Sequence, residues 1–384
     1  MELKDICQYI SEKVATTTLT KENYISTENM LPDKGGIVTA SGVPFGNSTA
    51  FSVGDVLVSN IRPYFKKIWQ ANRNGGCSAD VLCFRANSNV DNSYFYYLLS
   101  QQEFFDYIMS GAKGCKMPRG DKRQIMQWKV ELPPLDEQRH IASVLLSLDE
   151  KIELNRRING NLEQQAQALF KAWFVDFEPF KDGKFVDSEL GMIPEGWKVG
   201  NLSDIANITM GQSPDGKSYN ECGDGMIFYQ GRAEFGYRFP YVRLYTTQPK
   251  KIAEPLSILL SVRAPVGDIN IAYYKCCIGR GLAAIQCTNK CQSFLFYLIQ
   301  SLKPIFNQYN GEGTVFGSIS KEALSNIRIV IPKIEVINRF ESIAKNIDRL
   351  ILQYFLQIKN LESLRDTLLP RLMSGELNVN TITE

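Results

Sequence analysis

The sequence predicts a mixed α/β protein in which two similar globular domains are separated by two long antiparallel helices. Three observations predict this fold class. The chain repeats itself at an offset of 199 residues, so that Pro133 corresponds to Pro332. Each of these prolines ends an apolar, strand-like segment, and each is followed by a long helical pattern. The repeated order of domain and helix predicts an internal duplication with pseudo-twofold symmetry, because the second helix returns the chain antiparallel to the first.

An apolar seam runs along both predicted helices in alternating steps of three and four residues. This spacing keeps one stripe of a helix facing a partner helix and is typical of coiled coils. The alternative is an amphipathic helix on a globular core, but the pattern continues for about four heptads, which is long for such a helix. The predicted helix–helix seam consists of Leu145, Leu148, Ile152, Leu162, Leu169, Trp173, Ile347, Ile351, Ile358, Leu361, Leu368 and Leu372.

The repeat divides the chain into five segments. The predicted domains are 1–134 and 177–333, the predicted helices are 135–176 and 334–376, and a short tail occupies 377–384. Alternating β-branched residues and turn sequences predict short strands in both domains. In this arrangement two related heads lie at opposite ends of a helical spacer.

Composition indicates a globular protein and excludes several other classes. Charged residues make up 22% and hydrophobic residues 44% of the chain, which excludes a disordered protein. No apolar run reaches the roughly 18 residues of a membrane span, and the first residues lack a signal peptide's apolar stretch, so we expect a cytoplasmic protein. Nine cysteines without a CxxC pair predict reduced thiols and no metal site. The net charge of +2 excludes a uniformly basic surface but not local basic patches.

Four motifs resemble the specificity subunits of type I restriction–modification systems. PPLDEQRHIA at 133–142 resembles the beginning of the family's first conserved helix, and LFKAWFVDFEPF at 169–180 resembles its end. LGMIPEGW at 190–197 resembles the opening of the second recognition domain, and LLPRLMSGEL at 368–377 resembles the family's C-terminus. The motifs cover essentially the whole chain in the right order. The second repeat departs from the first motif, because it reads PKIEVI after the strand.

The resemblance implies a division of labour between this chain and its partners. Each domain is implied to be a target-recognition domain that reads one half of an asymmetric, bipartite site in double-stranded DNA. The helices are implied to set the distance between the half-sites and to dock two modification subunits, which methylate adenine with S-adenosylmethionine. Restriction subunits are implied to cut DNA with ATP and Mg²⁺. This chain is expected to bind no cofactor itself and to perform no catalysis.

Two basic stretches of the first domain are candidate DNA contacts. Lysine and arginine supply partners for phosphates and for guanine edges, and glycines between them permit close backbone approach. The alternative is an ordinary solvated surface, where lysine and arginine are common. The second stretch falls where the family has a glycine-rich recognition loop. The candidates are Arg62, Lys66, Lys67 and Arg73 in the first stretch and Lys113, Lys116, Arg119, Lys122 and Arg123 in the second.

In the second domain, arginines alternate with aromatic residues along 229–243. Arginine between aromatics suits a DNA groove or a flipped base, although the aromatics fit the core of strands better. The segment 311–317 matches the position of the glycine-rich loop but carries no cation, so that readout there depends on the backbone and Thr314. The candidate DNA contacts of this domain are Arg232, Arg238, Arg243, Arg263, Arg280 and Thr314.

The sequence lacks the motifs of the relevant catalytic classes. It contains no Asn/Asp-Pro-Pro-aromatic motif of an adenine methyltransferase and no Walker loop for ATP. The single histidine, His140, lacks the spacing of a metal ligand or of a catalytic triad. Two other functions remain open. One is a coiled-coil adaptor whose heads bind proteins, and the other is a silent or exchangeable specificity cassette.

Overall fold

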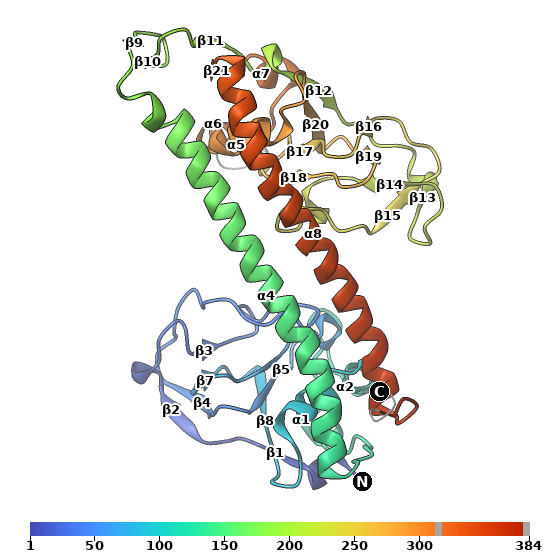
Figure 1. Cartoon of the computed structure of the whole chain (residues 1–384). Helices are drawn as coiled ribbons and strands as arrows, with labels where there is room; N and C mark the ends of the chain where they lie inside the picture. Colours follow the sequence, from blue (N-terminus) through green and yellow to red (C-terminus); the bar gives the residue numbers. More distant parts are fainter. Residues whose placement is uncertain (312–316, 379–384) are drawn as a thin grey trace. The chain divides into compact units, whose positions relative to one another are not determined.

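The computed structural model describes residues 1–311 and 317–378. The chain forms two compact units, Met1–Arg156 with Leu356–Glu384, and Arg157–Phe355. Each unit contains one globular head and part of both long helices, α4 (Leu135–Phe174) and α8 (Ile334–Met373), which Figure 1 draws in green and red. We call 1–134 the first head and 177–333 the second head. The mixed α/β class predicted from the sequence is confirmed.

The first head contains two four-stranded sheets and three short α-helices. The sheets have the orders β1-β8-β5-β6 and β2-β4-β7-β3, and only β3 and β7 pair in parallel. The strands are β1 (Cys7–Tyr9), β2 (Lys13–Ala15), β3 (Tyr24–Ile25), β4 (Asn47–Phe51), β5 (Val56–Ser59), β6 (Ile68–Gln70), β7 (Gly75–Cys77) and β8 (Val81–Ala86). The helices are α1 (Asn92–Leu99), α2 (Gln102–Ser110) and α3 (Lys122–Ile125).

Strand β5 is buried on both faces, which explains its unbroken apolar sequence. Val56 and Val58 belong to the core that β5 shares with α1, α2 and Leu145 of α4. Leu57 points the other way, into a second core with Phe51 of β4. A strand that is covered on both faces selects continuous aliphatic residues, whereas a half-exposed strand alternates.

The second head repeats the two sheets of the first head, and its second sheet has five strands in place of four. Its sheets have the orders β12-β20-β17-β18 and β13-β15-β14-β19-β16, and again one pair, β14 with β19, is parallel. The strands are β12 (Ala206–Met210), β13 (Tyr219–Asn220), β14 (Met226–Tyr229), β15 (Leu244–Thr246), β16 (Ile252–Ala253), β17 (Ile258–Ser261), β18 (Ile269–Ile271), β19 (Cys276–Ile278) and β20 (Leu282–Cys287). The helices are α5 (Gln292–Ser301), α6 (Lys303–Asn307) and α7 (Lys321–Ser325). Two further strand pairs join β9 (Phe185–Val186) to β10 (Ile193–Pro194) and β11 (Lys198–Asn201) to β21 (Arg328–Ile331).

The duplication extends to individual hydrogen bonds. The backbone N–H of Glu2 donates to the carboxylate of Asp5 at 2.8 Å, and Asn201 donates in the same way to Asp204 at 2.8 Å. Both turns directly precede the first strand of a four-stranded sheet, β1 or β12, and their residues are related by the predicted offset of 199. The internal duplication is therefore confirmed at atomic detail.

In the first unit the two long helices run antiparallel. Asp149 of α4 pairs with Arg365 of α8 at 2.7 Å, and Arg156 pairs with Glu362 at 2.9 Å. Residue numbers rise along α4 while they fall along α8. Both pairs are ionic, so charge as well as apolar packing joins this half of the helix pair.

The second unit shows the same antiparallel order with different chemistry. The Asn159 side-chain amide donates to the carbonyl oxygen of Ile351 at 3.2 Å, and the rings of Phe170 and Phe340 lie 5.7 Å apart. Ala166, which lies between these contacts on α4, is fully buried. None of the helices in 1–311 and 317–378 combines the length and apolar character that crossing a membrane requires.

Candidate nucleic-acid interface

The two basic stretches predicted in the first head form one surface. The stretch 60–67 follows β5 and the stretch 113–119 follows α2. The backbone N–H of Arg62 donates to the carbonyl oxygen of Pro118 at 2.8 Å, and Ile61 forms an antiparallel bridge with Arg119. Cations from two distant parts of the sequence are thereby held on one edge of the head. We call the stretches 60–67 and 113–119 the joined loops.

Unusual backbone conformations shape the joined loops. Arg62 and Lys66 have φ values of 50° and 49°, in the left-handed region, on either side of a short turn. At Gly120 an added Cβ would lie 2.6 Å from the Ile108 side chain and 2.9 Å from that of Asn60. Non-glycine residues in the left-handed region are strained and concentrate at functional sites, where the surrounding packing holds them.

The cations of the 113–119 loop are exposed and weakly paired. Lys113 lies 3.5 Å from Asp121 with 85% of its side chain exposed, and Arg119 lies 3.1 Å from Asp80 with 55% exposed. Lys116 is exposed as well. Surface ion pairs of this kind contribute little free energy, so the two carboxylates do not prevent the cations from binding a phosphate.

Lys67 is held more firmly than these cations. Its Nζ donates to the carbonyl oxygen of Thr27 at 2.6 Å, and burial lowers the pKa of its ammonium from the usual value. Lys66 is half-buried. These two lysines therefore shape the edge of the surface, whereas Lys113, Lys116 and Arg119 project from it.

A groove of about 770 Å³ borders the joined loops. The segments 24–29, 38–44 and 78–80 line it, and Asp80 connects it to Arg119. Phe45, next to the groove-lining loop, is 100% exposed. An exposed phenylalanine at the border of this groove suits stacking on bases or wedging between them.

Helix α3 adds two of the predicted contacts to this side of the head. Lys122 and Arg123 are exposed on its first turn. Asp121 precedes the helix and accepts hydrogen bonds from the backbone of Arg123 at 2.9 Å and of Gln124 at 3.3 Å. The same carboxylate pairs with Lys113, so α3 is tied to the joined loops.

Arg73 lies apart from the other predicted contacts of the first head. It belongs to the loop between β6 and β7, where the backbone N–H of Ala71 donates to the carbonyl oxygen of Asp55 at 2.8 Å. Asp55 directly precedes β5, whereas the joined loops follow β5. Arg73 is therefore at the opposite end of that strand, and its guanidinium lies over the Trp69 ring at 5.6 Å.

The second head contains the same pairing of loops. The backbone of Ala264 donates to the carbonyl oxygen of Gly317 at 2.9 Å, and Arg263 forms an antiparallel bridge with Ser318. Arg263 is exposed at this pairing. Thr314, the other predicted contact here, lies outside the described residues.

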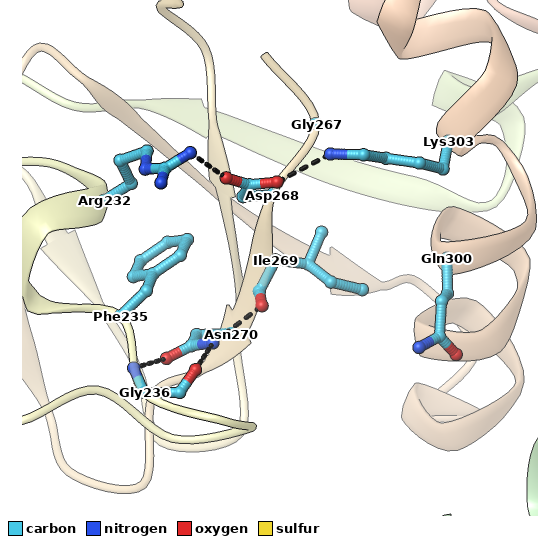
Figure 2. Close-up of a pocket in the computed structure, with 9 residues that line it drawn as sticks. All are labelled: Arg232, Phe235, Gly236, Gly267, Asp268, Ile269, Asn270, Gln300 and Lys303. Carbon is cyan, nitrogen blue, oxygen red and sulfur yellow. Dashed lines mark hydrogen bonds and ion pairs between the residues drawn. The ribbon is translucent and has the colours of Figure 1, made fainter. Parts of the chain in front are cut away.

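Beside these loops of the second head, the carboxylate of Asp268 pairs with two cations, Arg232 and Lys303 (Figure 2). The Asp268 carboxylate lies 2.5 Å from Nη1 of Arg232 and 2.6 Å from Nζ of Lys303. The three side chains border a pocket of about 420 Å³ that Phe235 and Gln300 also line. Two cations that converge on one anion suit a phosphate, and Asp268 competes with a phosphate for them.

Arg243 and Arg280 are exposed in different surroundings. Arg243 pairs with the buried carboxylate of Glu234 at 2.7 Å. Arg280 follows Gly279, where an added Cβ would lie 2.7 Å from the carbonyl oxygen of Gln230. This close approach places Arg280 beside the segment that begins with Gln230, which includes Arg232.

Comparison with known proteins identifies the family. A family model described as the type I restriction modification DNA specificity domain matches residues 1–164 and 194–365. The two matches cover most of the chain and fall on its two repeats. The chain belongs to this family.

Similar proteins extend the specificity-domain family match to the whole chain. The protein named as the MjaX type I restriction enzyme specificity subunit of Methanocaldococcus jannaschii is 37% identical over 311 residues, which cover 79% of this chain and 72% of the relative. The HindI type I restriction enzyme specificity subunit of Haemophilus influenzae is 25% identical over 98% of both chains. The crystal structure of the type I restriction-modification S subunit from M. genitalium is 17% identical, with a TM-score of 0.59 over 97% of this chain and 95% of that chain. That likeness supports the fold.

Within this specificity-domain chain, the prediction that Arg238 contacts DNA is wrong. Its side chain is 3% exposed and is paired with Glu163 of α4 and, at 2.6 Å, with Asp348 of α8. A guanidinium enclosed between two carboxylates cannot reach a phosphate or a base. The two aromatic residues next to it in the sequence differ in burial: Phe239 is buried, whereas Tyr237 is 73% exposed.

None of the twelve predicted seam residues is exposed. Leu145 and Leu372 belong to the core of the first head, and Ile351 belongs to that of the second. The helices therefore pack against the heads as well as along each other. The buried residues are Leu145, Ile152, Ile351, Ile358 and Leu372, and the half-buried ones are Leu148, Leu162, Leu169, Trp173, Ile347, Leu361 and Leu368.

Sequence reasoning missed the polar contacts between heads and helices. The Tyr97 hydroxyl donates to Asp149 of α4 at 2.7 Å, and Lys34 pairs with Asp366 of α8 at 3.4 Å. The sequence did contain a signal for these contacts, because Tyr97 and Asp149 recur in the second repeat as Tyr297 and Asp348. Across the described residues, no group of three or more His, Cys, Asp or Glu side chains is arranged to hold a metal ion.

Proposed function

We propose that this chain is the DNA specificity subunit of a type I restriction–modification complex. Each head reads one half of an asymmetric, bipartite site in double-stranded DNA. The joined loops of the first head carry this proposal, because their backbone pairing gathers exposed cations on one edge, next to a groove that Asp80 connects to Arg119. Cations supply phosphate contacts, and loop side chains and backbone groups supply base readout.

The two heads differ in charge at this edge, which accounts for an asymmetric target. The first head projects Lys113, Lys116 and Arg119. In the second head, two cations are already engaged by Asp268. Two related folds with different loop chemistry read different base sequences, because the fold positions the loops and the side chains select the bases.

We further propose that the chain performs no catalysis. The chain contains two repeats of head and helix, and these accommodate two modification subunits. The modification subunits methylate adenine with S-adenosylmethionine. Restriction subunits cut DNA with ATP and Mg²⁺. The specificity chain contributes the choice of sequence and binds none of these cofactors.

Methylation mapping tests the proposed function. The chain is co-expressed with a cognate modification subunit, and modified adenines are located across a genome. We expect methylation at one split motif with a constant spacer. A complex that assembles but methylates no motif contradicts the proposal and favours a silent cassette or a protein-binding adaptor.

Exchange of one head sharpens the test. The first head is replaced by that of a relative, and the second head and both helices stay unchanged. We expect only one half of the methylated motif to change. A change in both halves would contradict the assignment of one half-site to each head.

A further inference from the structure

Arg238 joins the second head to both long helices in one buried cluster. Its Nη1 donates to the Glu163 carboxylate on α4 and, at 3.1 Å, to the Tyr297 hydroxyl. Its Nη2 donates to Asp348 on α8 at 2.6 Å, and the Tyr297 hydroxyl donates to the same carboxylate at 2.8 Å. The guanidinium also lies 4.2 Å from the ring centroid of Phe296. One side chain thus contacts α4, α5 and α8 together.

The charges of this cluster are removed from water. The side chains of Arg238, Glu163 and Asp348 are 3%, 7% and 18% exposed. Burial by itself lowers the pKa of Arg238, but the negative charges of Asp348 and Glu163 outweigh burial and raise it, so the guanidinium stays charged. Buried charges are stable only while each keeps its partner, and the planar guanidinium bridges its partners in one geometry.

The first unit contains a related cluster with a different source of charge. Asp149, which corresponds to Asp348 in the repeat, accepts a hydrogen bond from the Tyr97 hydroxyl at 2.7 Å. Its cation is Arg365 of α8, at 2.7 Å. The cation at this aspartate therefore comes from a helix, and no arginine of the first head enters the cluster.

The first head attaches its own cation to the helices more loosely. Lys34 reaches Asp366 at 3.4 Å, and the Asp366 side chain is 52% exposed. A single, half-solvated pair restrains orientation far less than a buried cluster with several donors. The firm attachment through Arg238 is a property of the second unit.

Arg238 lies inside a segment of the second head that carries candidate DNA contacts. Arg232 and Arg243 stand at the ends of 232–243 and are exposed. The backbone of Ile271 in β18 donates to the Arg238 carbonyl oxygen at 2.8 Å. Asn270 holds Gly236 through two hydrogen bonds of 3.0 Å, which Figure 2 shows. The segment is therefore tied to the sheet on one side and to the helices on the other.

We infer that Arg238 is a positioning residue that restricts the complex to one spacer length between the two half-sites. The inference rests on the proposed function. Arg238 does not touch DNA, and it acts by holding 232–243 in one orientation on the helix pair. One base pair of B-DNA advances the next half-site by about 3.4 Å and rotates it by about 35°. A firmly held head accepts one spacer, whereas a loosened head also accepts its neighbours.

The test uses DNA in which the half-sites are constant and only the spacer length varies. The wild-type chain and its variants are each assembled with modification subunits, and adenine methylation is measured at every spacer. For Arg238→Gln we expect methylation at spacers one base pair longer or shorter to rise about tenfold relative to the wild-type spacer, because a buried ion pair is lost. We expect the base preferences within each half-site to stay unchanged.

Further variants separate positioning from folding. Arg238→Met combined with Glu163→Gln and Asp348→Asn leaves no unpaired buried charge, so the fold is retained while the cluster is lost. Arg238→Lys keeps the charge but not the planar fork, and we expect intermediate relaxation. The matched control is Arg156→Gln, which removes an arginine–glutamate pair between α4 and α8 that includes no head residue. We expect it to keep the wild-type spacer profile.

The outcomes distinguish the inference from the proposed function. The inference is overturned if the complexes of Arg238→Gln and of the triple variant assemble and keep the wild-type spacer profile. If Arg238→Gln does not assemble, the triple variant and Arg238→Lys decide by the same measurement. A wild-type complex that methylates no split motif contradicts the proposed function instead, before any variant is compared.

Discussion

The backbone N–H of Arg62 donates to the carbonyl oxygen of Pro118 at 2.8 Å, and this hydrogen bond joins two basic loops that are distant in the sequence. The pairing recurs in the second head between Ala264 and Gly317. A feature that both repeats retain while their side chains differ belongs to the shared architecture. It holds the loops together, and the exposed residues on them are free to vary with the DNA sequence that is read.

Removal of the projecting cations tests the first head's surface. We expect Lys113→Gln, Lys116→Gln and Arg119→Gln combined to weaken DNA binding by the assembled complex. Each lost phosphate contact reduces the slope of log affinity against log salt by about 0.9, so a loss of about two to three in slope is expected. Fluorescence anisotropy at several salt concentrations measures both quantities.

Arg73→Gln is the control for this triple variant. Arg73 lies at the opposite end of β5 and is similarly exposed. We expect its replacement to change affinity by less than about twofold, as most surface substitutions away from a site do. Equal losses for Arg73→Gln and for the triple variant would show that the joined loops are not the contact surface.

Cysteine reactivity offers a second test of the same loop. Cys115 and Cys222 are exposed, whereas burial raises the pKa of Cys7, Cys77 and Cys276 to about 12. At pH 8 a thiol with that pKa is ionised in only about one molecule in 10⁴, and the thiolate is the reactive form. We therefore expect iodoacetamide to modify Cys115 and Cys222 fastest.

DNA then separates these two thiols. Cys115 lies in the 113–119 loop, so we expect cognate DNA to slow its alkylation in the assembled complex. Cys222 is the internal control, because it lies outside every predicted contact. Peptide mass spectrometry gives both rates from one sample, and equal protection or no protection of Cys115 would contradict the interface.

Replacement of Asp268 is expected to strengthen DNA binding, in contrast to the removal of the cations. Asp268→Asn removes the carboxylate that engages Arg232 and Lys303 at 2.5 and 2.6 Å. Two cations are then released for phosphates, so we expect non-specific DNA binding to strengthen by about tenfold and its salt slope to steepen. Competition between cognate and random DNA should reveal lower specificity. Weaker binding to both DNAs would mean that Asp268 supports the pocket's structure instead.

Much of the fold was predictable because the sequence contains two copies of the same pattern of strands and helices. The offset that relates Pro133 to Pro332 also relates Asp5 to Asp204, so the pattern in one repeat supports the other. Long helices with sustained apolar periodicity are among the elements that sequence patterns predict best. Strand β5 shows the same duplication in the structure, because its buried aliphatic run recurs in β17.

The candidate site was predictable only in part, because its geometry depends on non-local contacts. Nothing in the local sequence indicates that Ile61 pairs with Arg119, although both loops were predicted separately. Arg238 was wrongly predicted to contact DNA for a related reason. It stands between exposed arginines in a strand-like segment, and only the fold brings Glu163 and Asp348 to it. An arginine's partners decide its role, and these partners come from two distant helices.

Gly120 tests whether the joining of the loops matters for recognition. An added Cβ would lie 2.6 Å from Ile108, 2.9 Å from Asn60 and 3.0 Å from Ile125, so Gly120→Ala forces the loop out of place. Overpacking of this kind typically costs about 1–3 kcal/mol, and here it disturbs the edge that carries Arg119. We expect a lower free energy of unfolding in urea and a loss of selectivity at one half of the methylated motif, with the other half retained. The control is Gly216→Ala in the second head, where no atom lies within 4 Å of the added Cβ. If Gly120→Ala methylates the wild-type motif with unchanged selectivity, the pairing of the loops serves only the fold, and recognition must depend on other parts of the first head.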